Sequence, residues 1–195
     1  MAYKIILGVI ATAIGFLSYI PYFRDIFKEK TKPHAFSWLV WSVLAGIAFF
    51  AQIVKGGGAG SWVNAGTAIM CLSVFIAAIF RGEKNIKISD WLSLVGAGIG
   101  LIFWALTSNP LWAVVLVTII DALGFIPTYH KSFYKPYEET LSTFTVSTIK
   151  YLISIIALES FNLTTWLFPA SLVLTNGSFV ILLLIRRKQI KALYT

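Results

Sequence analysis

The chain has 195 residues, of which 58% are hydrophobic and 12% are charged, and its formal net charge is +8. A soluble domain is about half apolar and about a quarter charged, so a mean hydropathy of +0.82 leaves too little polar surface to face water. The composition therefore excludes a soluble domain and indicates an integral membrane protein.

Seven apolar segments are long enough to be spanning helices, which need about 20 residues each. In chain order they cover residues 4–25, 36–55, 62–80, 90–107, 111–131, 140–158 and 164–185. Turn-forming sequences such as Gly56-Gly57-Gly58 and Asn109-Pro110 separate them. The first segment has no Ala-x-Ala cleavage site, so we expect it to be retained rather than removed as a signal peptide. These segments predict an all-α integral membrane fold with seven transmembrane helices.

Lysine and arginine residues collect on one side of these helices. Thirteen lie in the loops after the first, third and fifth helices and after the seventh: Arg24, Lys28, Lys30, Lys32, Arg81, Lys84, Lys87, Lys131, Lys135, Arg186, Arg187, Lys188 and Lys191. Only Lys4 and Lys55 fall on the other side. By the positive-inside rule, we expect a cell membrane protein with its N-terminus outside and its C-terminus in the cytoplasm. Because the basic residues are spread over short loops, nucleic acid is not an expected partner.

An internal repeat organises the chain. The segment from Gly15 to Phe27 recurs from Asp121 to Phe133, with Leu, Ile, Pro and Phe identical. The first three helices match the last three at offsets of 106, 105 and 104. The second and third offsets rest on the pairs Ser37/Ser142, Ser42/Ser147, Trp62/Trp166 and Phe75/Phe179.

The helix at 90–107 returns the chain across the membrane, so both copies have the same orientation in a 3+1+3 arrangement. The expected units are residues 1–82, a linker helix within 83–109, and residues 110–195 with a cytoplasmic tail. Small residues from Gly96 to Gly100 suit either packing of the linker against a bundle or a homo-oligomer contact, and the sequence leaves both open.

These features resemble the PQ-loop and SWEET-like superfamily of small-solute transporters, in its two-repeat seven-helix form. The resemblance rests on a proline, a basic loop and a serine in each repeat: Pro21, Lys30-Thr31-Lys32 and Ser37, then Pro127, Lys135-Pro136 and Ser142. The glutamine that follows the proline in the family is replaced by Tyr22 and Thr128. The resemblance implies a solute site between the bundles, lined by Asn176 and its neighbour Gly177 on the last helix. Its counterpart on the third helix is Leu72, or Cys71 in an adjacent register.

Two charged residues fall inside predicted helices. Asp121 and Lys150 each lie roughly 12–15 Å deep at 1.5 Å per residue, near the middle of a ~30 Å hydrocarbon layer. Because one charge at that depth costs at least a few kcal/mol, we expect the two to pair or to share a polar cavity. They then either bind solute or form a structural ion pair between consecutive helices.

Aromatic and proline residues supply the remaining candidates. Trp38 and Trp41 lie three residues apart on one helix face, where they could stack on a ring-bearing solute or close an inner gate. Pro21 and Pro127 each remove a helix hydrogen bond at equivalent places, which is typical of a hinge or of a static kink.

The predicted function is movement of a small polar solute by alternating access through a midplane cavity, with membrane lipid as the surroundings. Sugars, amino-acid-like and nucleoside-like solutes stay open, as does proton coupling at Asp121. The alternative is a non-transporting sensor or accessory protein whose Asp121–Lys150 pair is structural. A retinal photoreceptor using Lys150 is disfavoured by the repeat. One cysteine and no cluster of acid, base or metal ligands at one interface predict no enzyme activity, no metal and no cofactor.

Overall fold

A computed structural model describes residues 2–29, 33, 35–82, 88–134, 136, 137, 139 and 141–193. Within these residues the chain is all-helical and contains no strand. The elements are α1 (Ala2–Phe27), α2 (Ala35–Val54), the short 3₁₀ helix η1 (Gly58–Ser61), α3 (Trp62–Arg81), α4 (Ile88–Thr107), α5 (Leu111–Tyr134), α6 (Leu141–Ala157) and α7 (Leu163–Leu193). The basic-loop residues Lys30, Thr31, Lys32, Lys84, Lys87 and Lys135 lie outside the described residues.

Five of the helical segments are long and apolar enough to cross a membrane. They are α1, α2, η1 with α3, α5, and α7 as far as Lys191. The apolar parts of α4 and α6, Leu94–Thr107 and Leu141–Ala157, are shorter. Several long apolar helices are therefore compatible with a multi-pass membrane protein, as the composition predicts.

Each predicted segment is a helix, and the largest difference lies at the end of α7. The expected helix ends near residue 185, whereas α7 continues to Leu193 through the basic tail. Arg, Lys, Gln, Ala and Leu favour helix, and no glycine or proline interrupts this stretch. The helix therefore continues past its apolar segment.

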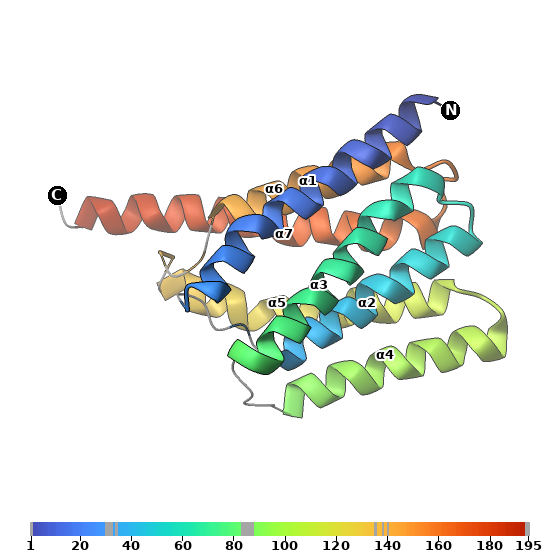
Figure 1. The fold of residues 1–195 in the computed structure, drawn as a ribbon, viewed down its shortest axis with the longest axis horizontal. Coiled ribbons are helices and arrows are strands. Elements are labelled where there is room, and N and C mark those ends of the chain that lie inside the picture. The colour runs from blue at the N-terminus through green and yellow to red at the C-terminus, as the bar shows by residue number, and fades with distance from the viewer. Residues whose placement is uncertain are drawn as a thin grey trace.

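The helices lie side by side in one elongated bundle (Figure 1). α1, α3, α5 and α7 run in one direction, and α2, α4 and α6 run in the other. The two termini consequently lie at opposite ends of the long axis. The ends of α1, α3 and α5 lie toward the same end of the bundle as the basic tail.

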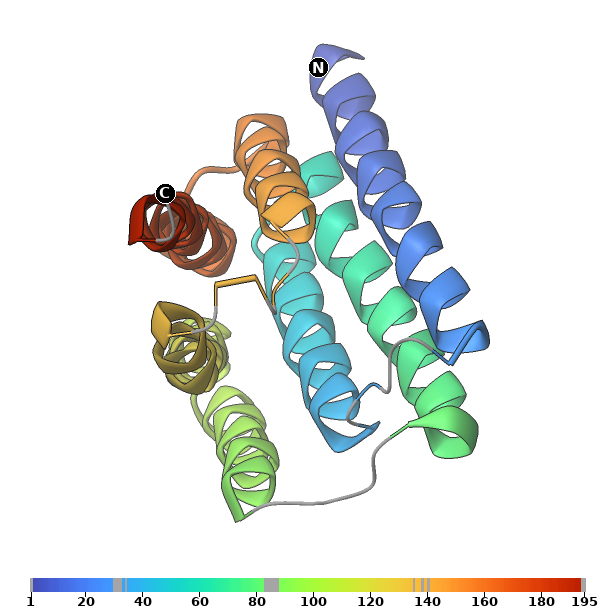
Figure 2. The same ribbon diagram turned by 90° about the vertical axis from the view of Figure 1, so that its left-hand side faces the viewer.

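The contacts between helices define two groups, whose members can be located from the end of the bundle in Figure 2. In one group α3 contacts both α1 and α2, and in the other α7 contacts both α5 and α6. Between the groups, α1 contacts α6 and α2 contacts α5. α4 lies outside, against α5 and α2.

Two of the small residues of α4, Gly96 and Gly100, face α5. A Cβ at Gly96 would lie 2.9 Å from the Ile120 side chain, and one at Gly100 would lie 3.4 Å from the Ala113 backbone. Ala97 and Ala113 are buried in the same apolar core as Val114. Of the two interpretations left open by the sequence, this packing uses Gly96 and Gly100 for contact of the linker with the bundle.

Turn residues act as the sequence predicts. Gly56 and Gly58 adopt φ angles of +72° and +59°, a left-handed conformation that favours glycine. The Asn109 side chain accepts a hydrogen bond from the Leu111 backbone N–H at 3.1 Å, which caps α5 beside Pro110. Both connections occupy the end of the bundle opposite the basic tail.

Candidate functional site

Lys150 extends from α6 into the space between α1 and α3. Its ammonium Nζ donates to Thr67 Oγ1 at 3.1 Å, and its side chain is 3% exposed. Nζ also lies 4.8 Å from the centre of the Tyr151 ring and 5.9 Å from that of Tyr19. These contacts hold a buried cation with one hydroxyl and two aromatic faces.

Gly15 on α1 provides the room for this lysine. A Cβ at Gly15 would lie 3.6 Å from Lys150 Cδ and 4.0 Å from Nζ. A larger side chain at that position would therefore compete with the lysine for space. In the internal repeat, Gly15 aligns with Asp121, so the first copy leaves a space where the second has a carboxylate.

A polar cluster that the sequence did not predict surrounds the ammonium. It consists of Tyr19, Thr67, Cys71 and Tyr151. Thr67 Oγ1 lies 3.2 Å from the Tyr151 hydroxyl, and the Tyr19 hydroxyl lies 3.6 Å from Cys71 Sγ. Two signals pointed to this cluster: Tyr151 follows Lys150 directly, and Tyr19 is in the repeated segment four residues after Gly15. Thr67 and Cys71 lie one helical turn apart on α3.

Asp121 is a second buried charge, and it has no direct partner among the described residues. It is 6% exposed, and its Oδ2 atom accepts no hydrogen bond within the described part of the chain. The carboxylate lies in Coulombic range of Cys71 and Tyr151. It therefore belongs to the same region as the polar cluster while remaining unsatisfied.

Asp121 and Lys150 do not form the ion pair that the sequence analysis considered. Among the described residues the one salt bridge joins Arg24 to Asp25 at 3.1 Å. The reason is the order of the helices, because α7 contacts both α5 and α6 and lies between them. Helices that are consecutive in the chain are not neighbours here, so Lys150 faces α1 and α3 instead.

Asn176 is buried on α7, at 5% exposure. Its Nδ2 donates to the Leu172 carbonyl of its own helix at 2.7 Å, and within the described residues no hydrogen bond joins it to Asp121 or Lys150. A Cβ at Gly177 would lie 3.5 Å from the Thr148 side chain, so the helices α6 and α7 approach closely there. An amide next to such a contact can accept and donate to a polar ligand.

Burial identifies the counterpart of Asn176 on α3. At an offset of 105, the buried residues Val63, Cys71, Val74 and Ala78 correspond to buried Phe168, Asn176, Phe179 and Leu183. At the offset of 104, Asn176 would correspond to Leu72, which is 44% exposed. The adjacent register left open in the sequence, with Cys71, therefore agrees with the packing.

Trp41 lies at the edge of an aromatic cluster rather than against the charges. It is 38% exposed, and its ring packs edge-on against Trp38 at 5.2 Å. Trp38 in turn contacts Tyr22 at 5.1 Å and Tyr19 at 6.1 Å. Trp38 and Tyr19, rather than Trp41, thus connect this cluster to Lys150.

The proposed hinge residues both lie inside unbroken helices. Pro21 is within α1 between Tyr19 and Tyr22, and Pro127 is within α5. The backbone is helical on both sides of each proline. Whether either position bends during function stays a prediction.

A polar seam, missed by the sequence analysis, joins the two groups of helices at the end opposite the basic tail. The backbone N–H groups of Glu159 and Ser160 donate to the carbonyls of Gly57 and Gly56, both at 3.1 Å. Ser154 Oγ donates to the Gly60 carbonyl at 2.8 Å. The α2–α3 connection is therefore hydrogen-bonded to the α6–α7 connection.

Buried amides extend this seam inward. Gln52 Nε2 donates to the Thr165 carbonyl at 2.5 Å, and Asn64 Nδ2 donates to Gln52 Oε1 at 2.8 Å. Gln52, Asn64 and Thr165 are fully buried. Hydrogen bonds between buried polar groups in apolar surroundings hold α2, α3 and α7 together at this end.

The described residues contain no group of three or more His, Cys, Asp or Glu side chains close enough to hold a metal ion. No family model, no curated protein and no solved structure matches the chain.

Proposed function

We propose that this protein is a multi-pass membrane transporter that moves a small polar solute between two like-oriented triple-helix bundles. The bundles are α1 to α3 and α5 to α7, with α4 as the linker in a 3+1+3 arrangement of the PQ-loop and SWEET-like type. The observation that carries the proposal is a pair of opposite, buried charges at the junction of the bundles that do not satisfy each other. Charges inside a membrane are expensive and are retained for function by default.

The pattern of helix contacts supports a two-fold relation between the bundles. Exchanging α1, α2 and α3 with α5, α6 and α7 turns the contact of α1 with α3 into that of α5 with α7. The same exchange relates three further pairs of contacts. It turns the contact of α2 with α3 into that of α6 with α7, the contact of α1 with α6 into that of α5 with α2, and the contact of α2 with α7 into that of α6 with α3. Parallel repeats about an axis along the membrane normal have this property.

A repeated arginine contact supports the same relation at the level of atoms. Arg81 at the end of α3 donates to the Phe27 carbonyl at 2.9 Å and lies 5.5 Å from its ring. Arg186 on α7 donates to the Phe133 carbonyl at 2.7 Å and lies 4.1 Å from its ring. The two contacts are related by the offsets of 105 and 106 that also match burial in the two repeats.

The charges favour a zwitterionic, amino-acid-like solute over sugars and nucleosides. The Lys150 ammonium would bind a carboxylate, and the Asp121 carboxylate would bind an ammonium, so that the solute satisfies both. Tyr19, Thr67 and Tyr151 offer hydroxyl groups to its other polar atoms. Asn176 would contribute from α7.

Alternating access would use the polar seam as the outer gate. The seam joins the α2–α3 connection to the α6–α7 connection at one end of the bundles, next to the contacts of α1 with α6. Its opening would let the bundles separate there. With the basic tail in the cytoplasm by the positive-inside rule, the seam faces outside. Pro21 and Pro127 would bend the first helix of each bundle at the opposite end.

Uptake into vesicles of purified, reconstituted protein tests this function. A panel of labelled amino acids, sugars and nucleosides identifies the solute, and we expect amino acids to accumulate. Lys150→Met and Asn176→Ala should each lower uptake about 10- to 100-fold, because each variant lacks a buried protein group that would form a hydrogen bond to the solute. Leu174→Ala is the matched control and should retain uptake, because Leu174 lies on the same helix as Asn176 and is 70% exposed.

The second candidate is a non-transporting sensor of the same fold. It predicts that a solute raises the melting temperature of the protein without entering the vesicles. The sensor predicted from the sequence has a structural Asp121–Lys150 ion pair. Because no such salt bridge is present among the described residues, the structure disfavours this form of the sensor hypothesis. Vesicles that exclude every solute in the panel would contradict the transport proposal.

A further inference from the structure

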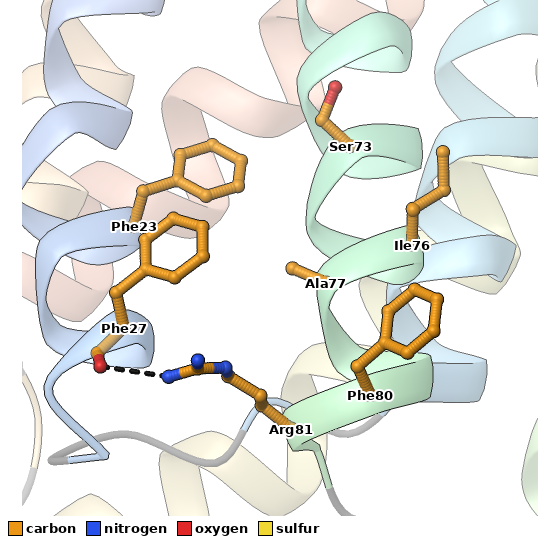
Figure 3. A pocket seen from close by; sticks show the side chains of 7 residues that line it. All are labelled: Phe23, Phe27, Ser73, Ile76, Ala77, Phe80 and Arg81. Atoms are coloured by element: carbon orange, nitrogen blue, oxygen red, sulfur yellow. Dashed lines mark hydrogen bonds between the residues drawn. The ribbon is translucent and has the colours of Figure 1, made fainter.

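A groove opens between α1 and α3 near the end of the bundle where both helices finish (Figure 3). Its volume is about 500 Å³, within the ~300–1,000 Å³ of small-molecule sites. Phe23 and Phe27 line it from α1. From α3 it is lined by Ser73, Ile76, Ala77, Phe80 and Arg81. Apart from the Ser73 hydroxyl and the arginine, these side chains are apolar.

The groove faces outward rather than into the bundle. Phe80 is 81% exposed and Phe27 is 60% exposed, and neither belongs to the buried core. In the proposed membrane orientation this surface meets lipid at the level of the cytoplasmic leaflet. The nearest material to fill an apolar groove there is an acyl chain.

Arg81 supplies a charge at the end of the groove. Its Nη1 donates to the Phe27 carbonyl, as the dashed line in Figure 3 marks. That bond uses one of the five N–H groups of the guanidinium. Arginine matches phosphate oxygens well, and basic sites between helices on the cytoplasmic side bind anionic headgroups.

The second repeat provides an internal comparison. There Arg186 makes the same contact with Phe133, but Leu182 stands in place of Ala77 and Tyr129 in place of Phe23. The Tyr129 hydroxyl donates to the Thr175 carbonyl at 2.7 Å and so bridges α5 and α7. The arginine contact is thus common to both repeats, whereas the small Ala77 is specific to the first.

We propose that this groove binds one anionic phospholipid of the surrounding bilayer, with an acyl chain between α1 and α3 and the phosphate at Arg81. The proposal goes beyond solute transport and rests only on the placement of the chain in a membrane. It makes the lipid a fixed partner of the first bundle, at the end opposite the polar seam.

Native mass spectrometry of the purified protein in mild detergent tests the site. Added phosphatidylglycerol and phosphatidylcholine with identical acyl chains compete for the protein. We expect one bound phosphatidylglycerol on the wild type, and none on Ala77→Leu, which introduces the side chain of the second repeat. Ser73→Leu, one turn away on the same wall, gives a second block that does not depend on the folding of the first variant.

Arg81→Gln tests the headgroup, and Arg186→Gln is its matched control. Each variant loses a hydrogen bond from an arginine to a phenylalanine carbonyl, of Phe27 or of Phe133. Only Arg81→Gln removes a charge from the groove. We expect Arg81→Gln to lower the preference for phosphatidylglycerol about fivefold, and Arg186→Gln to leave it unchanged.

Three results would overturn the proposal: phosphatidylglycerol retained by both groove-filling variants, equal loss of preference in Arg81→Gln and Arg186→Gln, or a dimer with the groove covered and no lipid bound. Because binding is measured without uptake, failure of the transport proposal leaves this test intact. Uptake by Ala77→Leu in vesicles containing both lipids separates the lipid site from the solute site.

Discussion

Single side chains at the bundle junction carry the strongest functional signal. Asp121 is buried, and its Oδ2 has no hydrogen-bond partner among the described residues. Within the same part of the chain, Lys150 makes one hydrogen bond, to Thr67. A protein built only for stability would remove or pair such charges, because leaving them buried costs free energy.

Asp121→Asn should therefore stabilise the protein and abolish uptake together. The amide keeps the shape of the side chain and removes an unpaired buried charge, which we expect to raise the free energy of unfolding by about 1–3 kcal/mol. Thermal melting in detergent measures this effect. Asp25→Asn, which removes the partly exposed partner of the exposed Arg24, is the control and should change stability by less than ~1 kcal/mol. Destabilisation by Asp121→Asn would mean that the carboxylate has a structural partner.

The double variant Asp121→Asn/Lys150→Met separates solute binding from mutual pairing. If the residues bind the two ends of a solute, the double variant remains as inactive as either single variant. If they stabilised each other, removing both would restore folding and function. Uptake and melting temperature of all three variants decide between these outcomes, and we expect no restoration of uptake.

Among the secondary-structure elements, η1 and α6 can approach closely at the polar seam because residue 60 is glycine. A Cβ at Gly60 would lie 2.6 Å from the Ser154 carbonyl oxygen and 2.7 Å from the Leu158 nitrogen. Because these are backbone atoms, the two elements would have to separate. The close approach of η1 to α6 at the proposed outer gate thus depends on the absence of one methyl group.

Gly60→Ala should open the seam. We expect a loss of about 1–3 kcal/mol in stability from the clash, and faster reaction of Cys71, the only cysteine, with an impermeant thiol reagent added outside. Gly98→Ala is the control, since no atom lies within 4 Å of its Cβ position and alanine favours helix. Unchanged labelling in Gly60→Ala would separate the seam from any gate.

At the scale of the molecule, the proposed topology places the two termini on opposite sides of the membrane. In a Cys71→Ala background, single cysteines at Tyr3 and at Lys188 should react with impermeant reagent from opposite faces, Tyr3 from outside. Both positions are exposed, so access rather than burial decides the labelling. Labelling of both from one face would contradict an odd number of spans.

The amino-acid sequence was sufficient to predict the seven helical segments and the two buried charges, and five of those segments are long and apolar enough to cross a membrane. These are local properties of the sequence. Hydropathy over about 20 residues identifies a membrane-spanning segment, and a charged residue within that segment can be recognised without knowing which helices are its neighbours. The repeat also pointed to Gly15 as the counterpart of Asp121. Among the helix ends, that of α7 differs most from the prediction, because helix propensity continues beyond the apolar stretch.

Tertiary structure alone decided which helices are neighbours. α7 separates α5 from α6, so Lys150 reaches Thr67 across the bundle junction instead of Asp121. The seam and the groove likewise depend on side chains from segments far apart in the chain. Hydropathy reports how favourable a helix is in lipid, whereas the choice of partner depends on close packing of small residues and on buried hydrogen bonds between helices, which no local pattern records.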